Sequence, residues 1–237
     1  MNTNGTPPVL SQQEIETPRS AAGMLTWVDA AHARFNTKRL KNEAREGKHF
    51  ANELVHEARP MALFAYRYFG ASPKVIITHV IGNQNYDGMV EDKRERAEAL
   101  RYLEVTTTLK TYEDSLRMEV LSKKGSVAAY GPVIAEGPRH RRISIKAPGV
   151  AREHQAIRAD HLKLVQEAVE RKAKKKYEPN TVLIVAIDDS VPFREKADVA
   201  VLDGLVTQTL VPALRGTNFS MLALEGSNGL HMCYRTT

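Results

Sequence analysis

The fold is decided by residues 74–110, KVIITHVIGNQNYDGMVEDKRERAEALRYLEVTTTLK, which contain three short β-type segments in a row. Residues 74–81 are rich in β-branched side chains, which favour strands. A Gly-Asn-Gln-Asn turn signal leads to residues 87–91, and a charged connection then leads to residues 101–110. We therefore expect three neighbouring strands in this region.

The third of these segments has two different faces. Side chains alternate along a strand, so Glu104 and Thr106 share one face while Leu103 and Val105 share the other. The apolar face is expected to pack on helices. The polar face then carries the carboxylate of Glu104.

The elements around this region predict an α/β fold, a mixed β-sheet flanked by helices. Apolar spacing predicts helices before the strands, and Pro60 is expected to kink or split the second of them. The expected elements are helices at 21–45, 48–69, 112–123, 161–176 and 197–214, and further strands at 181–187, 219–224 and 230–234.

We expect one domain over residues 21–237, with a small β insertion near 125–147 where Gly and Pro punctuate short apolar runs. Residues 1–20 are polar, contain Pro and Gly, and are predicted to form a flexible N-terminal arm. No repeat with a period of 20 to 50 residues is found.

Composition and the N-terminal sequence bear on the cellular compartment of the protein. The chain has 237 residues and no apolar run of about 18, so no membrane-spanning helix is expected. The N-terminus lacks a signal-peptide pattern, and the single cysteine, Cys233, has no internal partner for a disulfide. These features favour the cytoplasm.

The net charge of +6 comes from 34 basic and 28 acidic residues. Basic residues cluster at 93–96, 139–142 and 171–176, which suits a polyanion such as nucleic acid. A solvated helix face is the alternative interpretation of each cluster.

The acidic pair Asp87 and Glu104 is the candidate catalytic site. If Asp87 and Glu104 lie on adjacent strands, their carboxylates can bind Mg²⁺ or Mn²⁺, with the Val105 carbonyl as a third ligand. A metal ion polarises a phosphoryl oxygen and helps to generate the attacking hydroxide, as hydrolysis of a phosphodiester requires. Two carboxylates this close repel each other until a cation binds.

The run from Asp87 to Glu104-Val-Thr106, with a helix before it and a helix and strand after it, resembles the PD-(D/E)XK superfamily of restriction-endonuclease-like proteins. The resemblance covers roughly residues 48–189. It implies that Asp87 and Glu104 bind the metal and that a glutamate of the preceding helix, Glu53 or Glu57, joins the site. The chain departs from the pattern at Thr106, where the superfamily has the lysine that activates water.

Several groups are candidates for the work of that lysine. Lys110 shares the face of Glu104 but lies about 20 Å along the strand, which is too far. A lysine from elsewhere in the chain, Gln84 just ahead of Asp87, and a second metal ion all remain open. Loss of one such group costs about 10²- to 10³-fold in rate.

Other polar groups have structural interpretations as well. His56, His79 and His140 show no spacing typical of metal ligands. His231 and Cys233 share a strand face, but a catalytic Cys-His pair normally joins distant segments. The Asp188-Asp189 pair is either a second acidic site or a turn cap.

We therefore predict a metal-dependent nuclease-like protein that acts on phosphodiester bonds of nucleic acid, an endonuclease of the hydrolase class. Its candidate site residues are Asp87, Glu104, Thr106, Glu57 and Glu53. The alternative is a catalytically weak or inactive nucleic-acid-binding or regulatory module on the same fold, or a part of a larger assembly. The oligomeric state, a homodimer included, is left open.

Overall fold

The structure is a computed structural model that describes residues 9–108, 111–128, 130–137 and 144–236. It contains a seven-stranded sheet in the order β1-β2-β3-β4-β7-β8-β9 and a separate pair, β5-β6. The strands are β1 (Arg19–Ser20), β2 (Val75–His79), β3 (Gly88–Asp92), β4 (Tyr102–Thr107), β5 (Ile134–Glu136), β6 (Ser144–Lys146), β7 (Thr181–Ile187), β8 (Phe219–Gly226) and β9 (His231–Arg235).

The sheet is mixed, as predicted. The strands from β1 to β4 pair antiparallel, the central pairs β4-β7 and β7-β8 are parallel, and the hairpin β8-β9 is antiparallel. The parallel centre forms because helices cross over between β4, β7 and β8. The continuous apolar run of β7 is buried along nearly its whole length, as expected of a strand that is covered on both faces.

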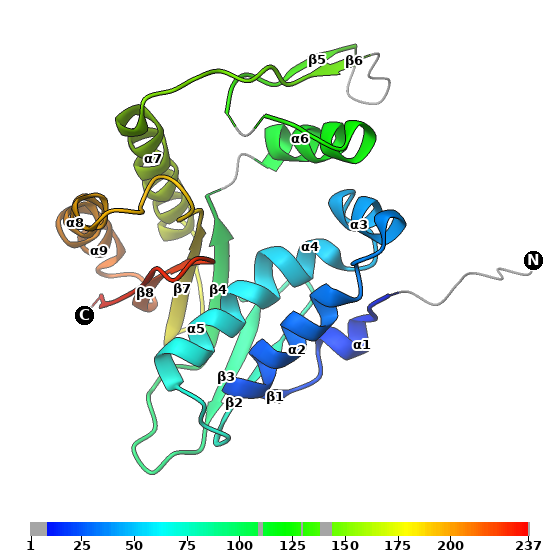
Figure 1. Cartoon of the computed structure of the whole chain (residues 1–237). Coiled ribbons are helices and arrows are strands. Elements are labelled where there is room, and N and C mark those ends of the chain that lie inside the picture. The colour runs from blue at the N-terminus through cyan, green and yellow to red at the C-terminus, as the bar shows by residue number, and fades with distance from the viewer. Residues whose placement is uncertain (1–8, 109–110, 129, 138–143, 237) are drawn as a thin grey trace, which may run out of the picture.

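Helices cover both faces of the sheet (Figure 1). On one face, α2 and α5 pack on the apolar side chains of β2, β4 and β7; on the other, α7 and the helix that follows β7 form a second core. The α-helices are α1 (Gln12–Ile15), α2 (Ala21–Ala33), α3 (Lys38–Arg45), α4 (Ala51–Glu53), α5 (Arg59–Phe69), α6 (Thr111–Lys124), α7 (His154–Ala173), α8 (Lys196–Leu205) and α9 (Val211–Leu214).

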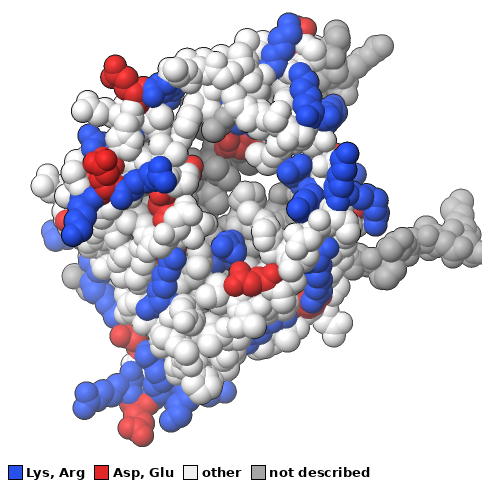
Figure 2. Space-filling model, viewed as in Figure 1, with Lys and Arg blue, Asp and Glu red and all other residues white. Residues whose placement is uncertain are grey.

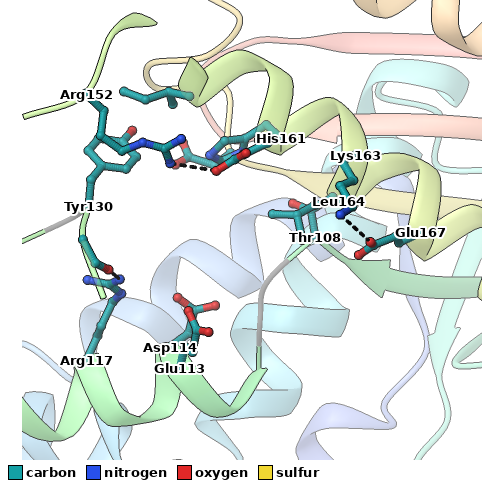
Figure 3. Close-up of a pocket in the computed structure, with 14 residues that line it drawn as sticks. Thr108, Glu113, Asp114, Arg117, Tyr130, Arg152, His161, Lys163, Leu164 and Glu167 are labelled. Atoms are coloured by element: carbon teal, nitrogen blue, oxygen red, sulfur yellow. Dashed lines mark hydrogen bonds and ion pairs between the residues drawn. The ribbon is translucent and has the colours of Figure 1, made fainter. Parts of the chain in front are cut away.

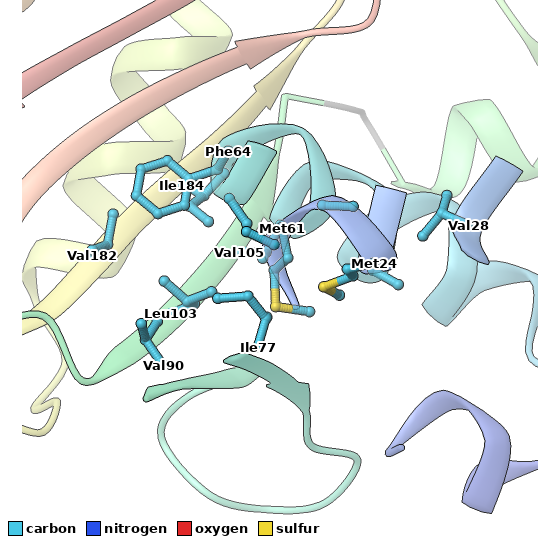
Figure 4. Packing of buried hydrophobic residues seen from close by; sticks show 14 of the residues in the cluster. Met24, Val28, Met61, Phe64, Ile77, Val90, Leu103, Val105, Val182 and Ile184 are labelled. Atoms are coloured by element: carbon cyan, nitrogen blue, oxygen red, sulfur yellow. The ribbon is translucent and has the colours of Figure 1, made fainter. Parts of the chain in front are cut away.

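The core under α2 and α5 is shown in Figure 4. Met24, Met61 and Phe64 of these helices lie in one cluster with Leu103 and Val182 of the sheet, and the exposed fraction of each of the five residues is 2% or less. Leu103 therefore packs on helices, as its strand face predicts.

Two π-helical segments interrupt the long helices, and each ends two residues before a proline. Leu54–Ala58 precedes Pro60, and Val206–Leu210 precedes Pro212. Proline lacks an N–H and its ring clashes with the carbonyl four residues earlier, so a widened turn ahead of it relieves both problems. The helix predicted at 48–69 therefore begins at Ala51 and contains a π-helical segment just before Pro60. It ends at Gly70, which has a φ of 67°.

Three sequence predictions need correction. The arm predicted for residues 1–20 does not extend that far, because Gln12–Ile15 form α1, Arg19–Ser20 form β1, and Leu10 and Ile15 are buried. Residues 1–8 lie outside the described part of the chain. The helix predicted at 21–45 is two helices, α2 and α3, and α7 begins seven residues earlier than expected.

The predicted insertion contains the β5-β6 pair, whose strands lie within residues 134–146. The basic cluster at 139–142 lies outside the described residues.

Among the described residues, one helical stretch, Lys196–Leu214, is long and apolar enough to cross a membrane by length and composition alone. Length and composition alone do not test the expectation that no helix spans a membrane, because a buried core helix meets the same criteria. The side chains Leu202, Val206, Leu210 and Leu214 of this stretch are buried in the core that α7 shares.

We predict that Val182→Ala lowers the free energy of unfolding by about 2 kcal/mol, because it removes two buried methyl groups and leaves a cavity in the core under α2 and α5. Val201→Ala is the matched control, since 43% of Val201 is exposed on α8. Its effect should stay within about 0.5 kcal/mol. Urea denaturation of both variants measures the difference, and equal losses would contradict the assigned core.

Candidate functional site

Asp87 lies at the point where β3 begins beside β4. Its backbone N–H donates to the Leu103 carbonyl (2.8 Å) and its carbonyl accepts from the Val80 N–H (2.9 Å). Its side chain does the unusual part, because Oδ2 accepts a hydrogen bond of 2.7 Å from the Val105 N–H. The carboxylate thus accepts the β4 hydrogen bond that a backbone carbonyl of a neighbouring strand would otherwise accept.

Glu104 points to the opposite face of β4 from Leu103, and only 6% of it is exposed. The ammonium group of Lys172, in the last turn of α7, contacts Oε1 of Glu104. The Tyr177 hydroxyl donates to the same oxygen at 3.3 Å. The glutamate is therefore buried together with a positive charge, which lowers the cost of burying it.

Thr106 occupies the next position on that face and is also buried. Its Oγ1 accepts a hydrogen bond of 2.8 Å from the guanidinium group of Arg171. Two consecutive basic residues of α7 therefore reach the face of β4 that carries Glu104 and Thr106.

The acidic pair is electrostatically coupled. Burial and the Glu104 carboxylate raise the pKa of Asp87 to about 7, and Glu57 adds to the rise. The Val105 N–H and the Lys172 ammonium oppose it. Asp87, Glu104, Glu57 and Lys172 therefore lie close enough to form one group of interacting charges.

Glu57 comes from the π-helical segment and contacts the sheet through His79. Its Oε2 lies 2.8 Å from Nε2 of His79, whose side chain is fully buried on β2. The other ring nitrogen, Nδ1, has no hydrogen-bond partner among the residues the structure describes. Glu53, one turn earlier, makes no hydrogen bond or ion pair with a described residue.

The oxygens of these carboxylates are of the type that a hard divalent cation prefers. One oxygen each of Asp87 (Oδ1), Glu104 (Oε2) and Glu57 (Oε1) accepts no hydrogen bond from the described residues, and carboxylate oxygens are the ligands that Mg²⁺ and Mn²⁺ prefer. The N–H and C=O of one strand residue point the same way, so the Val105 carbonyl faces the Asp87 side. Ligand atoms of the three carboxylates do not all lie within 4.8 Å of one another among the residues described. Mg²⁺ needs only one or two of them, because it keeps several waters.

The amide group of Gln84 is engaged within its own loop. Its side-chain amide donates to the carbonyls of Val80 and Tyr86 (2.9 Å each), which fastens the loop ahead of Asp87. Its contribution is to hold the loop that delivers the carboxylate.

Asp189 acts as a turn cap, the structural alternative expected for the Asp188-Asp189 pair. Its carboxylate accepts hydrogen bonds from the backbone N–H groups of Asn228 (2.9 Å) and Leu230 (3.0 Å). Both groups belong to the β8-β9 turn. His140 lies outside the described residues.

A cavity of about 400 Å³ opens where β4 and β7 end, between α6, α7 and the insertion (Figure 3). Arg152, ion-paired with Asp160 at 2.7 Å, and His161 line one side, and Asp114 lines another. Thr108, at its wall, is four residues beyond Glu104, or about 13 Å along the strand. The cavity is therefore separate from the acidic pair.

Positive charge is spread over several surfaces. Figure 2 shows basic side chains over α3, at the right of the view, and around the loop at 93–96, at the lower left. Among the residues of α3, Lys38, Arg39 and Lys41 are exposed. The lysine run at 174–176 is also exposed, directly after the two residues that reach β4.

Sequence reasoning missed Lys172, Tyr177 and His79 as members of the site. The amphipathic helix that ends in a lysine run was the available signal for Lys172, although it could not show which lysine turns inward. Nothing in the spacing of His79 pointed to Glu57.

Comparison with known proteins adds no relative: this chain matches no family model, no curated protein and no solved structure.

Asp87→Asn tests the electrostatics of the site. Because the pKa of Asp87 is raised from 3.8 to about 7, its contribution to stability is fully present below pH 3.8 and is lost as the pH rises to about 7. The amide keeps an oxygen for the Val105 N–H but carries no charge. We expect the variant to be more stable than the wild type by about 1–2 kcal/mol at pH 8, allowing for solvent screening.

The measurement is urea denaturation in EDTA at pH 4 and pH 8. The advantage of Asp87→Asn should appear only at the higher pH, and Asp29→Asn, at an exposed aspartate of α2, serves as the control. An advantage that is the same at both pH values would contradict the coupling.

Proposed function

We propose that this chain is a metal-dependent nuclease-like protein that acts on phosphodiester bonds of nucleic acid, with a restriction-endonuclease-like fold. One observation carries the proposal. The carboxylates of Asp87 and Glu104, from adjacent strands, share one group of interacting charges with Lys172. The order of elements around them, a helix, three antiparallel strands, a helix and a parallel strand, also supports it.

In this proposal Asp87 and Glu104 hold Mg²⁺ or Mn²⁺, and Glu57 supports the ion from the helix side. The bound ion would polarise the phosphoryl oxygen and lower the pKa of a bound water. Cation binding also removes the repulsion within the acidic pair, which is strongest when both groups are ionised.

Lys172 takes over the task of the lysine that Thr106 replaces. Its ammonium rests on Glu104 in the structure, and a cation at the carboxylate would weaken that contact. The side chain is then available to orient the attacking water or to neutralise charge on the phosphate. Arg171 stays on Thr106 and holds the end of α7 against β4. His79 orients Glu57 through its 2.8 Å contact.

We expect Mn²⁺-dependent cleavage of single- or double-stranded DNA or RNA, and we expect it to vanish in the double variant Asp87→Ala, Glu104→Ala. Lys172→Met should lower the cleavage rate about 10²- to 10³-fold, because it removes one preorganised positive group at the reacting centre. Labelled oligonucleotides resolved on denaturing gels provide the rates.

Lys175→Met is the matched control, since it removes one positive charge from the same basic run but at an exposed side chain. Its rate should stay within a few-fold of the wild type. Cleavage that persists in the double variant would remove the acidic pair from the site, and equal losses in the two lysine variants would reduce Lys172 to a surface charge.

A second candidate function follows from the same contact. Lys172 already neutralises Glu104, and 14% of its side chain is exposed, so the group is also compatible with a nucleic-acid-binding module that does not cleave. Such a module should bind nucleic acid through the exposed basic residues. Fluorescence anisotropy should then show affinity falling at least tenfold between 50 and 200 mM salt without cleavage, because bound phosphates release counterions. Binding that is insensitive to salt would exclude it.

A further inference from the structure

A group of side chains of the types that ligate metals lies at the other edge of the sheet, on the β8-β9 hairpin. Strand register places Glu225 of β8 opposite His231 of β9. Cys233, two residues further along β9, shares the face of His231. All three therefore meet on the side of the sheet that α5 covers.

The distances within this group are short. Nδ1 of His231 lies 2.6 Å from Oε1 of Glu225, and Nε2 lies 3.7 Å from Sγ of Cys233. Ligand atoms of the three residues all lie within 4.8 Å of one another, and among the described residues this is the group of three that meets that limit. The contacts form a chain from carboxylate to imidazole to thiol.

Arg67 of α5 fixes the carboxylate end. It donates to Oε2 of Glu225 at 2.9 Å and to the carbonyls of Gly226 (3.0 Å) and Leu230 (2.8 Å). The Glu225 side chain is completely buried, and this contact leaves Oε1 directed at His231. The imidazole is thereby held with Nε2 toward Cys233, provided that Nδ1 carries the proton.

A carboxylate that accepts a hydrogen bond from a histidine is a common arrangement around zinc-binding histidines. Metal-binding histidines commonly donate their second N–H to a carboxylate, which orients the ring. With Zn–N near 2.05 Å and Zn–S near 2.3 Å, two ligands of a tetrahedral ion are about 3.6 Å apart. The observed separation of Nε2 and Sγ is 3.7 Å.

We propose that the β8-β9 hairpin is a binding site for a borderline-soft divalent ion of the zinc type, with Nε2 of His231 and Sγ of Cys233 as ligands and Glu225 as the support of the imidazole. Binding replaces the thiol proton by the ion and releases that proton to solvent. Water fills the remaining positions. The site is chemically distinct from the carboxylate group at Asp87, which suits Mg²⁺ or Mn²⁺.

The rival interpretation is a nucleophilic cysteine activated by the imidazole of His231. Alkylation of Cys233 at neutral pH separates the two interpretations, because a nucleophilic cysteine requires a thiolate in the metal-free protein. An approach route for an ion exists, because His231 and Cys233 are only partly buried and β9 is the last strand of the sheet.

Cobalt provides a direct test, because Co²⁺ replaces zinc and its bond to a thiolate absorbs in the near ultraviolet. Tag-free full-length protein, stripped with EDTA, is titrated with Co²⁺ and then with Zn²⁺. We expect one equivalent to produce the thiolate band and Zn²⁺ to abolish it. Cys233→Ser and His231→Ala should each lose the band, and Glu225→Gln should keep it with about 10- to 100-fold weaker binding.

Two controls separate this site from other binding. His32→Ala, at an exposed histidine of α2, and the double variant Asp87→Ala, Glu104→Ala should both keep the band. Circular dichroism checks that each variant is folded, and Cys233→Ala replaces Cys233→Ser if the latter is not. A missing band in the wild type, a band that survives loss of Cys233, or rapid alkylation of Cys233 by iodoacetamide at neutral pH would overturn the proposal.

Discussion

The hydrogen bond from the Val105 N–H to the Asp87 carboxylate is the contact on which the proposed site depends. Strands β3 and β4 pair only at Gly88 with Leu103 and at Met89 with Tyr102, so β4 continues past the end of its partner. The N–H of Val105 therefore has no backbone carbonyl of β3 opposite it, and burying a donor without a partner costs free energy. Asp87 satisfies that donor, and in doing so brings a second carboxylate beside Glu104. The raised pKa of Asp87 follows from this placement, because the carboxylate is buried next to Glu104.

Local chemistry made much of the fold predictable. β-Branched runs, turn residues and side-chain alternation identified six of the seven strands of the sheet, all but β1, and the face of β4 that holds Glu104 and Thr106. The same alternation placed Leu103 on the helical side. These features depend on residues within one segment, where the period of the side chains determines which way each one points.

Features that depend on distant residues could not be predicted. Lys172 is 68 positions from Glu104, and five basic residues lie at the end of α7 within 171–176, so only the packing of that helix on β4 selects the one that contacts Glu104. Packing likewise fixes Leu10 and Ile15, which hold a stretch that its polar composition predicts as a loose arm. The choice of Glu57 over Glu53 follows from the π-helical turn and from His79, whose contact spans 22 residues.

Location of a bound ion by crystallography tests the central claim most directly, because it asks where a cation binds rather than what it does. Crystals soaked in Mn²⁺ and measured at an energy where manganese scatters anomalously should show a peak within about 2.5 Å of Asp87 Oδ1 and Glu104 Oε2. The Lys172 ammonium should have moved off Glu104 in the same map. A map without a peak at the acidic pair, with Lys172 still on Glu104, would contradict the account.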